Sequence, residues 1–192
     1  MTETKNILLV GVGGQGTILA SKVLAAGLIK AGYDVKMSEV HGMAQRGGSV
    51  TTQIRYGKKV YSPIIGEGQA DIIVAFEMME AQRWIDHLKP GGKIVVNNYA
   101  IPSVPILIGE AEYPDGILED LKEKVETTTV INAIGVAKEL GNVRIQNIVM
   151  LGSLVKALDL DEMDWEEVIR EEVKEKYVDI NIKALNRGKE LV

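Results

Sequence analysis

The chain has 192 residues, of which 46% are hydrophobic and 26% are charged, a length and composition typical of a single domain with a sizeable core. Its net charge of −5, without any basic tract, argues against a nucleic-acid backbone as the main partner, and the absence of cysteine excludes thiolate-bound iron–sulfur clusters, disulfides and a thiol nucleophile in this chain. No apolar run reaches the roughly 20 residues that a membrane span needs, and the first residues lack the basic region of a signal peptide, so we expect a cytoplasmic protein that binds no membrane.

The chain opens with a strand, a glycine loop and a helix. Residues 6–10 are a short apolar run, typical of a strand covered on both faces, and the glycines of residues 11–16 end it. Residues 17–31 predict a helix, with Gly32 suited to its carboxyl end. Residues 34–40 predict a second strand, which gives a βαβ unit with a right-handed crossover.

A hairpin is expected next. Residues 49–56 alternate strictly in the chemistry of their side chains, and this period of two predicts a strand. Gly57 and Lys58 indicate a tight turn, and residues 59–61 a short return strand.

The remaining chain alternates strands and helices before it becomes helical. We expect strands at 71–76, 93–97 and 127–131, an irregular stretch at 100–115 around a short strand at 106–108, and helices at 77–88, 118–124, 132–140, 145–158, 164–176 and 179–190. Gly27 and Gly152 lie inside predicted helices, where they would allow close packing, and Asp164 suits the N-cap of its helix. The sequence therefore predicts a single α/β domain over residues 1–192. It is Rossmann-like, with a mostly parallel sheet flanked by helices, an added β-hairpin and a helical C-terminal segment at 145–192.

The glycine loop at 11–16 has the G-x-G-x-x-G spacing between a strand and a helix, which suits a nicotinamide or flavin nucleotide. Glu39, near the end of the second strand, is placed to accept a ribose hydroxyl. A methyltransferase is a second interpretation, because residues 88–92 followed by an apolar strand are common in that class. A third interpretation carries at least equal weight: both features reflect only the geometry of a parallel sheet, without a bound ligand.

A second loop, at 41–48, fits neither ligand. It places His41, Gln45 and Arg46 within six residues, between glycines that allow close backbone approach. Loops at the carboxyl ends of strands are where open α/β sheets place function. By spacing alone, a functional loop and a simple turn with Arg46 in a salt bridge are equally good interpretations.

Taken together, the two loops resemble the gamma-type domain of the 2-oxoacid:ferredoxin oxidoreductases. The resemblance rests on Gly11-Val12-Gly13-Gly14-Gln15-Gly16 and His41-Gly42-Met43-Ala44-Gln45-Arg46-Gly47-Gly48. It continues through residues 147–152 and 181–188, and so covers nearly the whole chain. Pyruvate and 2-oxoglutarate members tend to carry a tyrosine or phenylalanine version of the second loop. The His-Gly-Met-Ala-Gln form points to the arylpyruvate branch.

The resemblance implies oxidative decarboxylation of an arylpyruvate with coenzyme A as co-substrate and oxidised ferredoxin as electron acceptor. It also implies that this chain alone binds no cofactor, since it has no Gly-Asp-Gly diphosphate–magnesium motif and no cysteine. Thiamine diphosphate, Mg²⁺ and 4Fe-4S clusters are expected on a larger alpha subunit, and ferredoxin is expected to react through the complex.

We further expect the two loops to lie side by side at the carboxyl edge of the sheet and to face that partner. His41, Gln45 and Arg46 are the candidate catalytic residues, with Arg46 neutralising a substrate carboxylate or a coenzyme A phosphate. The candidate residues for binding cofactor or co-substrate are Gly11, Gly13, Gly14, Gln15, Gly16, Gly47 and Gly48.

Overall fold

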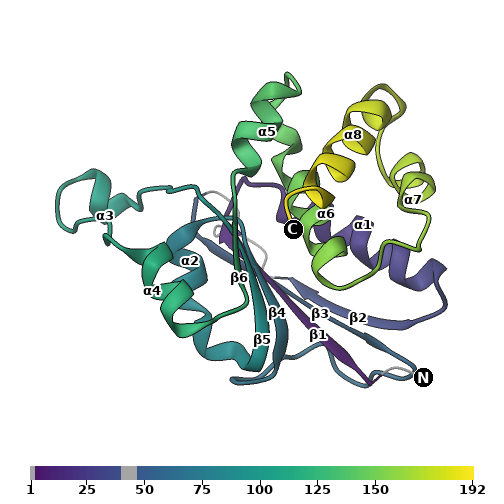
Figure 1. The fold of residues 1–192 in the computed structure, drawn as a ribbon, viewed down its shortest axis with the longest axis horizontal. Helices are drawn as coiled ribbons and strands as arrows, with labels where there is room; N and C mark the ends of the chain where they lie inside the picture. The colour runs from purple at the N-terminus through teal and green to yellow at the C-terminus, as the bar shows by residue number, and fades with distance from the viewer. Residues whose placement is uncertain (1–2, 40–46) are drawn as a thin grey trace.

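A computed structural model of the chain describes residues 3–39 and 47–192. Its centre is a six-stranded sheet in the order β2-β3-β1-β4-β5-β6 (Figure 1). The strands are β1 (Lys5–Val12), β2 (Asp34–Glu39), β3 (Ser49–Gly57), β4 (Ala70–Ala75), β5 (Leu88–Asn97) and β6 (Thr128–Ile131). Strands β1, β4, β5 and β6 run parallel, so the predicted mostly parallel α/β sheet is confirmed.

The antiparallel strand β3 lies between β1 and β2 and pairs with both. The helix α1 (Thr17–Lys30) therefore connects two parallel strands, as predicted, but these strands are separated by β3. The predicted return strand at 59–61 is wrong. Both edges of β3 are already paired, and the Val60 amide instead donates to Asp34 Oδ2 at 2.9 Å. The hairpin in this part of the sheet is the β2–β3 pair.

Helices cover both faces of the sheet (Figure 1). The first face packs against α2 (Met78–Arg83) and α4 (Ile117–Lys124), and the second against α1, α5 (Ala133–Glu139), α6 (Gln146–Ala157), α7 (Trp165–Glu172) and α8 (Val178–Lys189). Short 3₁₀ turns occupy Ile85–His87, Val143–Ile145 and Glu175–Tyr177. In the described residues, no helix is long and apolar enough to cross a membrane.

Two predictions near the middle of the chain, one of a helix and one of a strand, need correction. The helix expected at 77–88 ends at Arg83, and β5 already begins at Leu88, so Lys89 to Gly92 belong to a strand. The short strand expected at 106–108 is instead the helical turn α3 (Val104–Leu107). Pro105 lies in the first turn of α3, where its missing N–H costs nothing because the first helical amides have no acceptor inside the helix.

Glycines allow two close helix contacts, as the sequence predicts. Gly27 of α1 faces Trp165, and a Cβ at Gly27 would lie 2.5 Å from the indole ring. Helices α6 and α8 cross at Gly152 and Gly188, where a Cβ on either glycine would lie 2.1 Å from a carbonyl oxygen of the other helix. The C-terminal helices are thereby fixed against the face of the sheet that carries α1.

Candidate functional site

The two glycine segments lie side by side at the carboxyl end of β1. The Gly13 amide donates to the Gly48 carbonyl at 2.8 Å, and the Gly47 amide donates to the Gly13 carbonyl at 3.2 Å. These bonds continue the β1–β3 ladder, in which Val12 pairs with Ser49. The predicted juxtaposition is therefore confirmed for Gly47 and Gly48. His41, Gln45 and Arg46 lie outside the described residues.

The side chain of Gln15 holds the first loop in shape. Its Oε1 accepts a hydrogen bond from the Val12 amide at 2.8 Å, and its Nε2 donates to the Phe76 carbonyl at 2.8 Å. Gly11 leaves room for this arrangement, since a Cβ there would lie 2.8 Å from Gln15 Oε1. Gln15 is buried, and both ends of its amide are used inside the fold. Its role is therefore to tie the loop to the end of β4.

Gly16 begins helix α1 and requires a left-handed conformation, with φ of +80°. A Cβ on Gly16 would also lie 2.7 Å from Nδ2 of Asn147, which donates to the Gly16 carbonyl at 3.1 Å. Asn147 is buried in the first turn of α6, so α6 supports the loop from behind. This support is visible in the structure, whereas the sequence indicated Asn147 only as part of a resemblance.

The amino end of α1 is suited to an anion. The first amides of a helix lack acceptors within it and carry partial positive charge. Among the described residues no side chain caps α1, and its first turn contains no acidic residue. An anionic group placed beside these amides would satisfy them, as phosphates do at the starts of other α/β helices.

A pocket of about 250 Å³ opens between these elements. The glycine loop, the first turn of α1 and the start of β3 form it, and its lining residues are Gly13, Gly14, Gly16, Thr17, Ile18, Val50, Thr51 and Thr52. Backbone amides and threonine hydroxyls supply its polar groups. Three of the predicted glycines, Gly13, Gly14 and Gly16, therefore line a cavity, whereas Gly11, Gly47 and Gly48 do not line it, and we take this cavity as the candidate site.

Two buried carboxylates lie next to this site, and the sequence analysis missed them. Glu77 and Glu80 follow the carboxyl end of β4, and both are almost fully buried. Glu77 Oε2 accepts from the Glu80 amide at 2.9 Å, which caps α2. Glu80 Oε2 accepts from the Ser49 hydroxyl at 2.5 Å, directly after Gly48. Two acidic residues shortly after a buried strand, at the start of a helix, were the available signal.

Glu80 should make stability depend on pH. Burial raises its pKa, opposed in part by the hydrogen bond from Ser49 and the charge of Arg83. The unfolded carboxyl therefore loses its proton at lower pH, near 4.3, than the folded one does. Stability contributed by this group is present below pH 4.3 and falls as pH rises through the folded pKa.

We therefore expect Glu80→Gln to lose less stability than the wild type between pH 4.5 and pH 8, measured by urea unfolding. Glu119→Gln, on the exposed side of α4, controls for the loss of one charge. Parallel pH profiles for wild type and Glu80→Gln would contradict this role of Glu80.

Two features of the sequence suggested a nicotinamide or flavin nucleotide or a methyltransferase. In the structure, residues of both features make contacts within the fold. Glu39 accepts a hydrogen bond from the Ser21 hydroxyl of α1 at 2.7 Å. Lys89, in the segment common to methyltransferases, forms an ion pair with Asp71. Although burial acts to raise it, the hydrogen bonds from Lys89 and the Asn6 amide hold the pKa of Asp71 below its ordinary value. These contacts support the interpretation of both features as sheet geometry.

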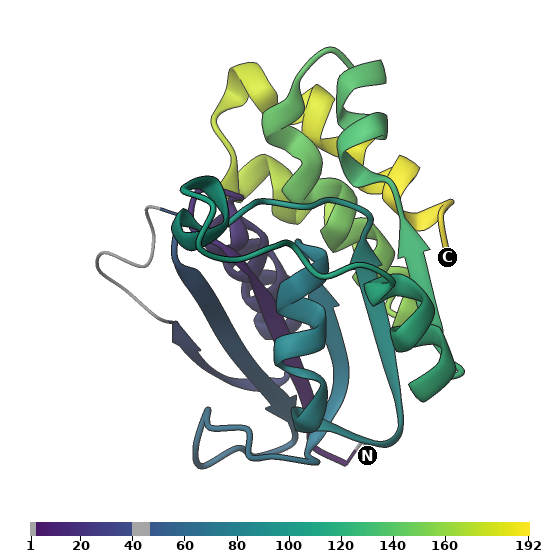
Figure 2. The same cartoon turned by 90° about the vertical axis from the view of Figure 1, so that its left-hand side faces the viewer.

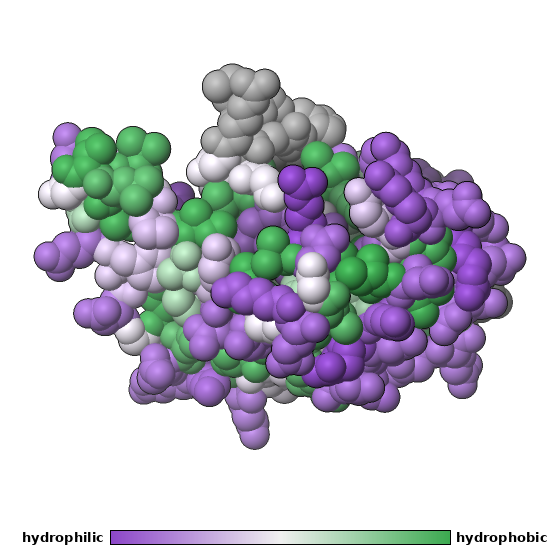
Figure 3. Space-filling model, turned by 90° about the horizontal axis from the view of Figure 1, so that it is seen from above, coloured by the Kyte–Doolittle hydropathy of each residue, from purple (hydrophilic) through white to green (hydrophobic). Residues whose placement is uncertain are grey.

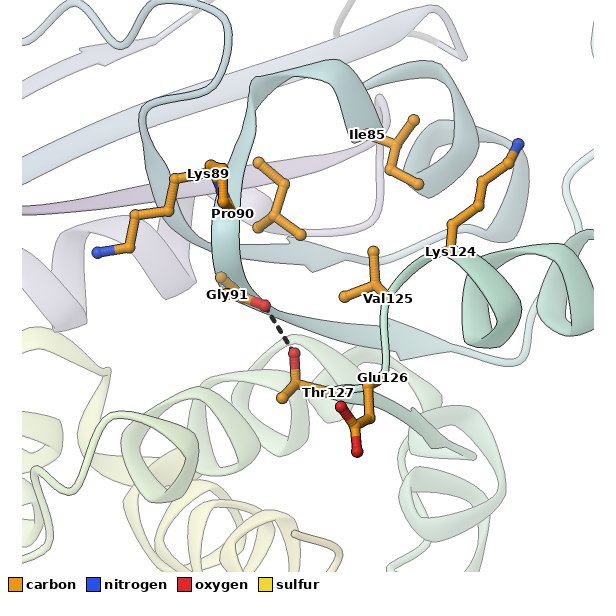
Figure 4. Close-up of a pocket in the computed structure, with 10 residues that line it drawn as sticks. Ile85, Lys89, Pro90, Gly91, Lys124, Val125, Glu126 and Thr127 are labelled. Atoms are coloured by element: carbon orange, nitrogen blue, oxygen red, sulfur yellow. Dashed lines mark hydrogen bonds between the residues drawn. The ribbon is translucent and has the colours of Figure 1, made fainter.

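A larger pocket, of about 440 Å³, lies where β5 begins, at the amino edge of the sheet (Figure 4). Ile85 and Val125 point into it, while Lys89 and Lys124 point away. Those lysines pair with Asp71 and Asp120. Size therefore does not identify the site, because ligands of open α/β sheets bind outside the carboxyl ends of the strands.

Known proteins resemble this chain over nearly its whole length. Residues 6–191 match the family described as pyruvate ferredoxin/flavodoxin oxidoreductase. The indolepyruvate oxidoreductase subunit IorB of Pyrococcus horikoshii is 42% identical over 190 residues, which cover 95% of this chain and 93% of that protein. Four relatives at 35–42% identity carry this name, whereas four at 26–30% are named as pyruvate/ketoisovalerate or 2-oxoglutarate subunits.

Solved structures share the fold. The gamma subunit of a keto/oxoacid ferredoxin oxidoreductase from Geobacter sulfurreducens is 25% identical, with a TM-score of 0.73, and the match covers 99% of this chain and 97% of that one. A 2-oxoglutarate:ferredoxin oxidoreductase from Magnetococcus marinus, with 2-oxoglutarate, coenzyme A and succinyl-CoA bound, has a TM-score of 0.73 at 23% identity. The match covers 100% of this chain but 31% of that longer one. With its paired glycine loops and this match over nearly its whole length, the chain belongs to the pyruvate ferredoxin/flavodoxin oxidoreductase family.

Proposed function

We propose that this chain is the beta subunit of an indolepyruvate, or more broadly arylpyruvate, ferredoxin oxidoreductase of the cytoplasm. The complex would convert an arylpyruvate and coenzyme A to an aryl-acetyl-CoA and carbon dioxide, and pass the electrons to ferredoxin. The chain would complete the active site of a larger alpha subunit and would be inactive alone. The four relatives with the indolepyruvate name support this branch over the pyruvate and 2-oxoglutarate branches, through their higher identity.

One observation carries the proposal: the hydrogen-bonded pair of glycine segments beside the amino end of α1. The arrangement gives a pocket at the carboxyl edge of the sheet, lined by glycine backbone and by the first turn of α1. It suits an anionic group of a ligand that is held mainly by another subunit. Coenzyme A, with its phosphates, and a 2-oxoacid, with its carboxylate, both carry such groups.

The cofactors would belong to the alpha subunit. This chain has no cysteine, so 4Fe-4S clusters would be bound by cysteines of the partner. Thiamine diphosphate with Mg²⁺ would supply the decarboxylation chemistry there. The contribution of this chain would be to position the substrates and to exclude water at the contact between the subunits.

Within this division, the second loop carries the charged group. Arg46 would neutralise the substrate carboxylate or a coenzyme A phosphate, since a guanidinium can bind either with two hydrogen bonds. His41 and Gln45 would orient polar groups of the substrates. The amides at the start of α1, with the backbone of Gly13, Gly14 and Gly16 beside them, would form the wall against which the anion lies, and Gly47 and Gly48 would hold the first loop in place through their hydrogen bonds to Gly13.

The test is a complex reconstituted from this chain and its alpha subunit. We expect arylpyruvate- and coenzyme A-dependent reduction of a viologen dye only after both subunits are mixed. Arg46→Ala should lower kcat/KM by about tenfold or more while leaving assembly intact, and Arg46→Lys should restore part of it, because lysine keeps the charge but loses the planar fork.

Other outcomes would identify the competing functions. Dye reduction by this chain alone, or tight binding of NAD or FAD to it, would indicate a stand-alone nucleotide-binding protein. Preference of the complex for pyruvate or 2-oxoglutarate would indicate a gamma subunit of those enzymes. Normal turnover, coenzyme A affinity and assembly in Arg46→Ala would show that the second loop is structural.

A further inference from the structure

A short apolar turn protrudes from the carboxyl edge of the sheet. After β5 ends, the chain leaves the sheet and forms α3 before it returns at α4 (Figures 1 and 2). Val104, Leu107 and Ile108 are 68%, 71% and 62% exposed, and none of the residues of α3 is buried. Figure 3 shows the corresponding hydrophobic patch at one corner of the molecule. We call these three side chains, with the turn that carries them, the α3 knob.

The backbone of the α3 knob is well organised. The Leu107 amide donates to Ser103 at 3.0 Å, and the Ile108 amide donates to Val104 at 3.1 Å. Pro105 restricts the first turn further. Three large apolar side chains on a fixed, protruding turn are costly in water unless another surface covers them.

The buried carboxylate of Glu77 holds the chain on both sides of the α3 knob. Glu77 Oε1 accepts from the Ile101 amide at 3.1 Å, before the knob, and from the Tyr113 hydroxyl, after it. Burial and the neighbouring Glu77 raise the pKa of Tyr113, so this hydroxyl keeps its proton and donates. Glu77 also caps the helix that carries Glu80, which contacts Ser49 of the candidate site. The α3 knob is therefore connected, through Glu77 and Glu80, to the edge of the sheet that carries the paired glycine loops.

The segment of the chain that carries the α3 knob has charged residues of one sign. Between Lys93 and Lys122 the chain contains no lysine or arginine, and its charged residues are Glu110, Glu112, Asp115, Glu119 and Asp120. A surface that complements the knob would therefore offer an apolar hollow bordered by basic side chains.

We propose that the α3 knob is the element that docks this chain onto the larger subunit, by inserting Val104, Leu107 and Ile108 into such a hollow. This inference rests on the proposed function. The larger subunit is the expected partner because the knob lies at the same edge of the sheet as the loops that would face that subunit, and because this fold makes up 31% of a longer chain in the Magnetococcus marinus structure. Burial of three large apolar side chains would contribute to the affinity of the interface through the area that they remove from water.

The test measures the dissociation constant between this chain and its alpha subunit by sedimentation or calorimetry. Leu107→Asp should weaken binding at least tenfold. Ile29→Asp is the matched control, because Ile29 is 60% exposed near the end of α1 at the opposite edge of the sheet, and it should change binding less than twofold. Both variants should keep the wild-type melting temperature, since neither side chain is buried.

Further measurements separate the possible failures. At saturating concentrations Leu107→Asp should recover the wild-type dye-reduction rate, because the candidate site is intact. Glu110→Lys together with Glu112→Lys should slow association at low salt, as rim charges mainly affect that rate. Unchanged affinity of Leu107→Asp, or self-association of this chain that Leu107→Asp abolishes, would overturn the docking role. Failure of the wild-type pair to bind or turn over would instead overturn the proposed function.

Discussion

Replacing Gly152 with valine should leave no cooperatively folded protein. A Cβ at Gly152 would lie 2.1 Å from the Leu185 carbonyl oxygen and 3.0 Å from the Gly188 Cα, both of which are backbone atoms of α8. Helix α8 would have to move by more than an ångström, and the contact of Gly188 with the Val149 carbonyl would be lost with it. Interiors pack too densely to absorb such a shift, so the cost should exceed about 4 kcal/mol, a large part of an ordinary stability.

The measurement is urea unfolding followed by circular dichroism, with size-exclusion chromatography of the soluble fraction. Gly152→Ala gives the graded form of the same change and should lower the unfolding midpoint strongly. In an exposed helix the same substitution would raise stability by about 1 kcal/mol, so the sign itself is diagnostic. Lys156→Ala, on the exposed side of α6, controls for changes to that helix. A Gly152→Ala protein with an unchanged midpoint would show that the two helices do not cross as closely as described.

The helix contacts were predictable because their signals are local. Gly27 and Gly152 interrupt otherwise apolar helices, and a glycine inside a helix is justified only by close packing or function. The same local reasoning placed Asp164 at the start of α7, where its carboxylate accepts from the Glu167 amide at 3.0 Å. The partner of each glycine, Trp165 or Gly188, could not be predicted, because the pairs are separated by 138 and 36 residues.

The position of β3 could not be predicted for a related reason. The alternation in residues 49–56 correctly indicated a strand, but alternation carries no information about its neighbours. The nearest apolar residues after the turn suggested a hairpin with 59–61. Instead β3 pairs with β2, the strand before it, and with β1, which is distant in sequence, and both offer longer edges than residues 59–61. Eight residues of β1 and six of β2 are aligned with it.

The candidate site was only partly predictable. The glycine spacing correctly placed the first loop between β1 and α1, and the contact of Gly13 with Gly47 and Gly48 agrees with the side-by-side arrangement. The roles of Gln15, Glu77 and Glu80 could not be predicted in this way. Their hydrogen-bond partners lie in other parts of the chain, which only the fold brings close. A glutamine within a ligand-binding pattern suggests a ligand contact, yet its amide is used by Val12 and Phe76. Sequence patterns predict loop geometry better than they predict which polar groups remain available.

Changing Gly16 to alanine should damage the site and the fold together. The residue has φ of +80°, which costs a residue with a Cβ about 1–2 kcal/mol. The new Cβ would also lie 2.7 Å from Asn147 Nδ2, so the hydrogen bond to the Gly16 carbonyl would be lost or displaced, at about another 1 kcal/mol. We expect a total loss of about 2–3 kcal/mol in urea unfolding. In the reconstituted complex, activity should fall about 100-fold, because displacements near 1 Å have that effect on positioned groups.

Gly32→Ala separates the backbone cost of a positive φ from the cost of the contact with Asn147. Gly32 follows the other end of α1 and has φ of +87°, but a Cβ there would meet nothing within 4 Å. This control therefore has the same backbone cost without the contact with Asn147, and it lies at the edge of the sheet away from the candidate site. It should lose about 1–2 kcal/mol and keep full activity in the complex. Equal stability losses in Gly16→Ala and Gly32→Ala would show that Asn147 yields without cost. Full activity in Gly16→Ala would show that the start of α1 takes no part in holding the substrates. The pair of variants thus distinguishes a loop whose glycines serve only the turn from one that α6 holds in position for a ligand.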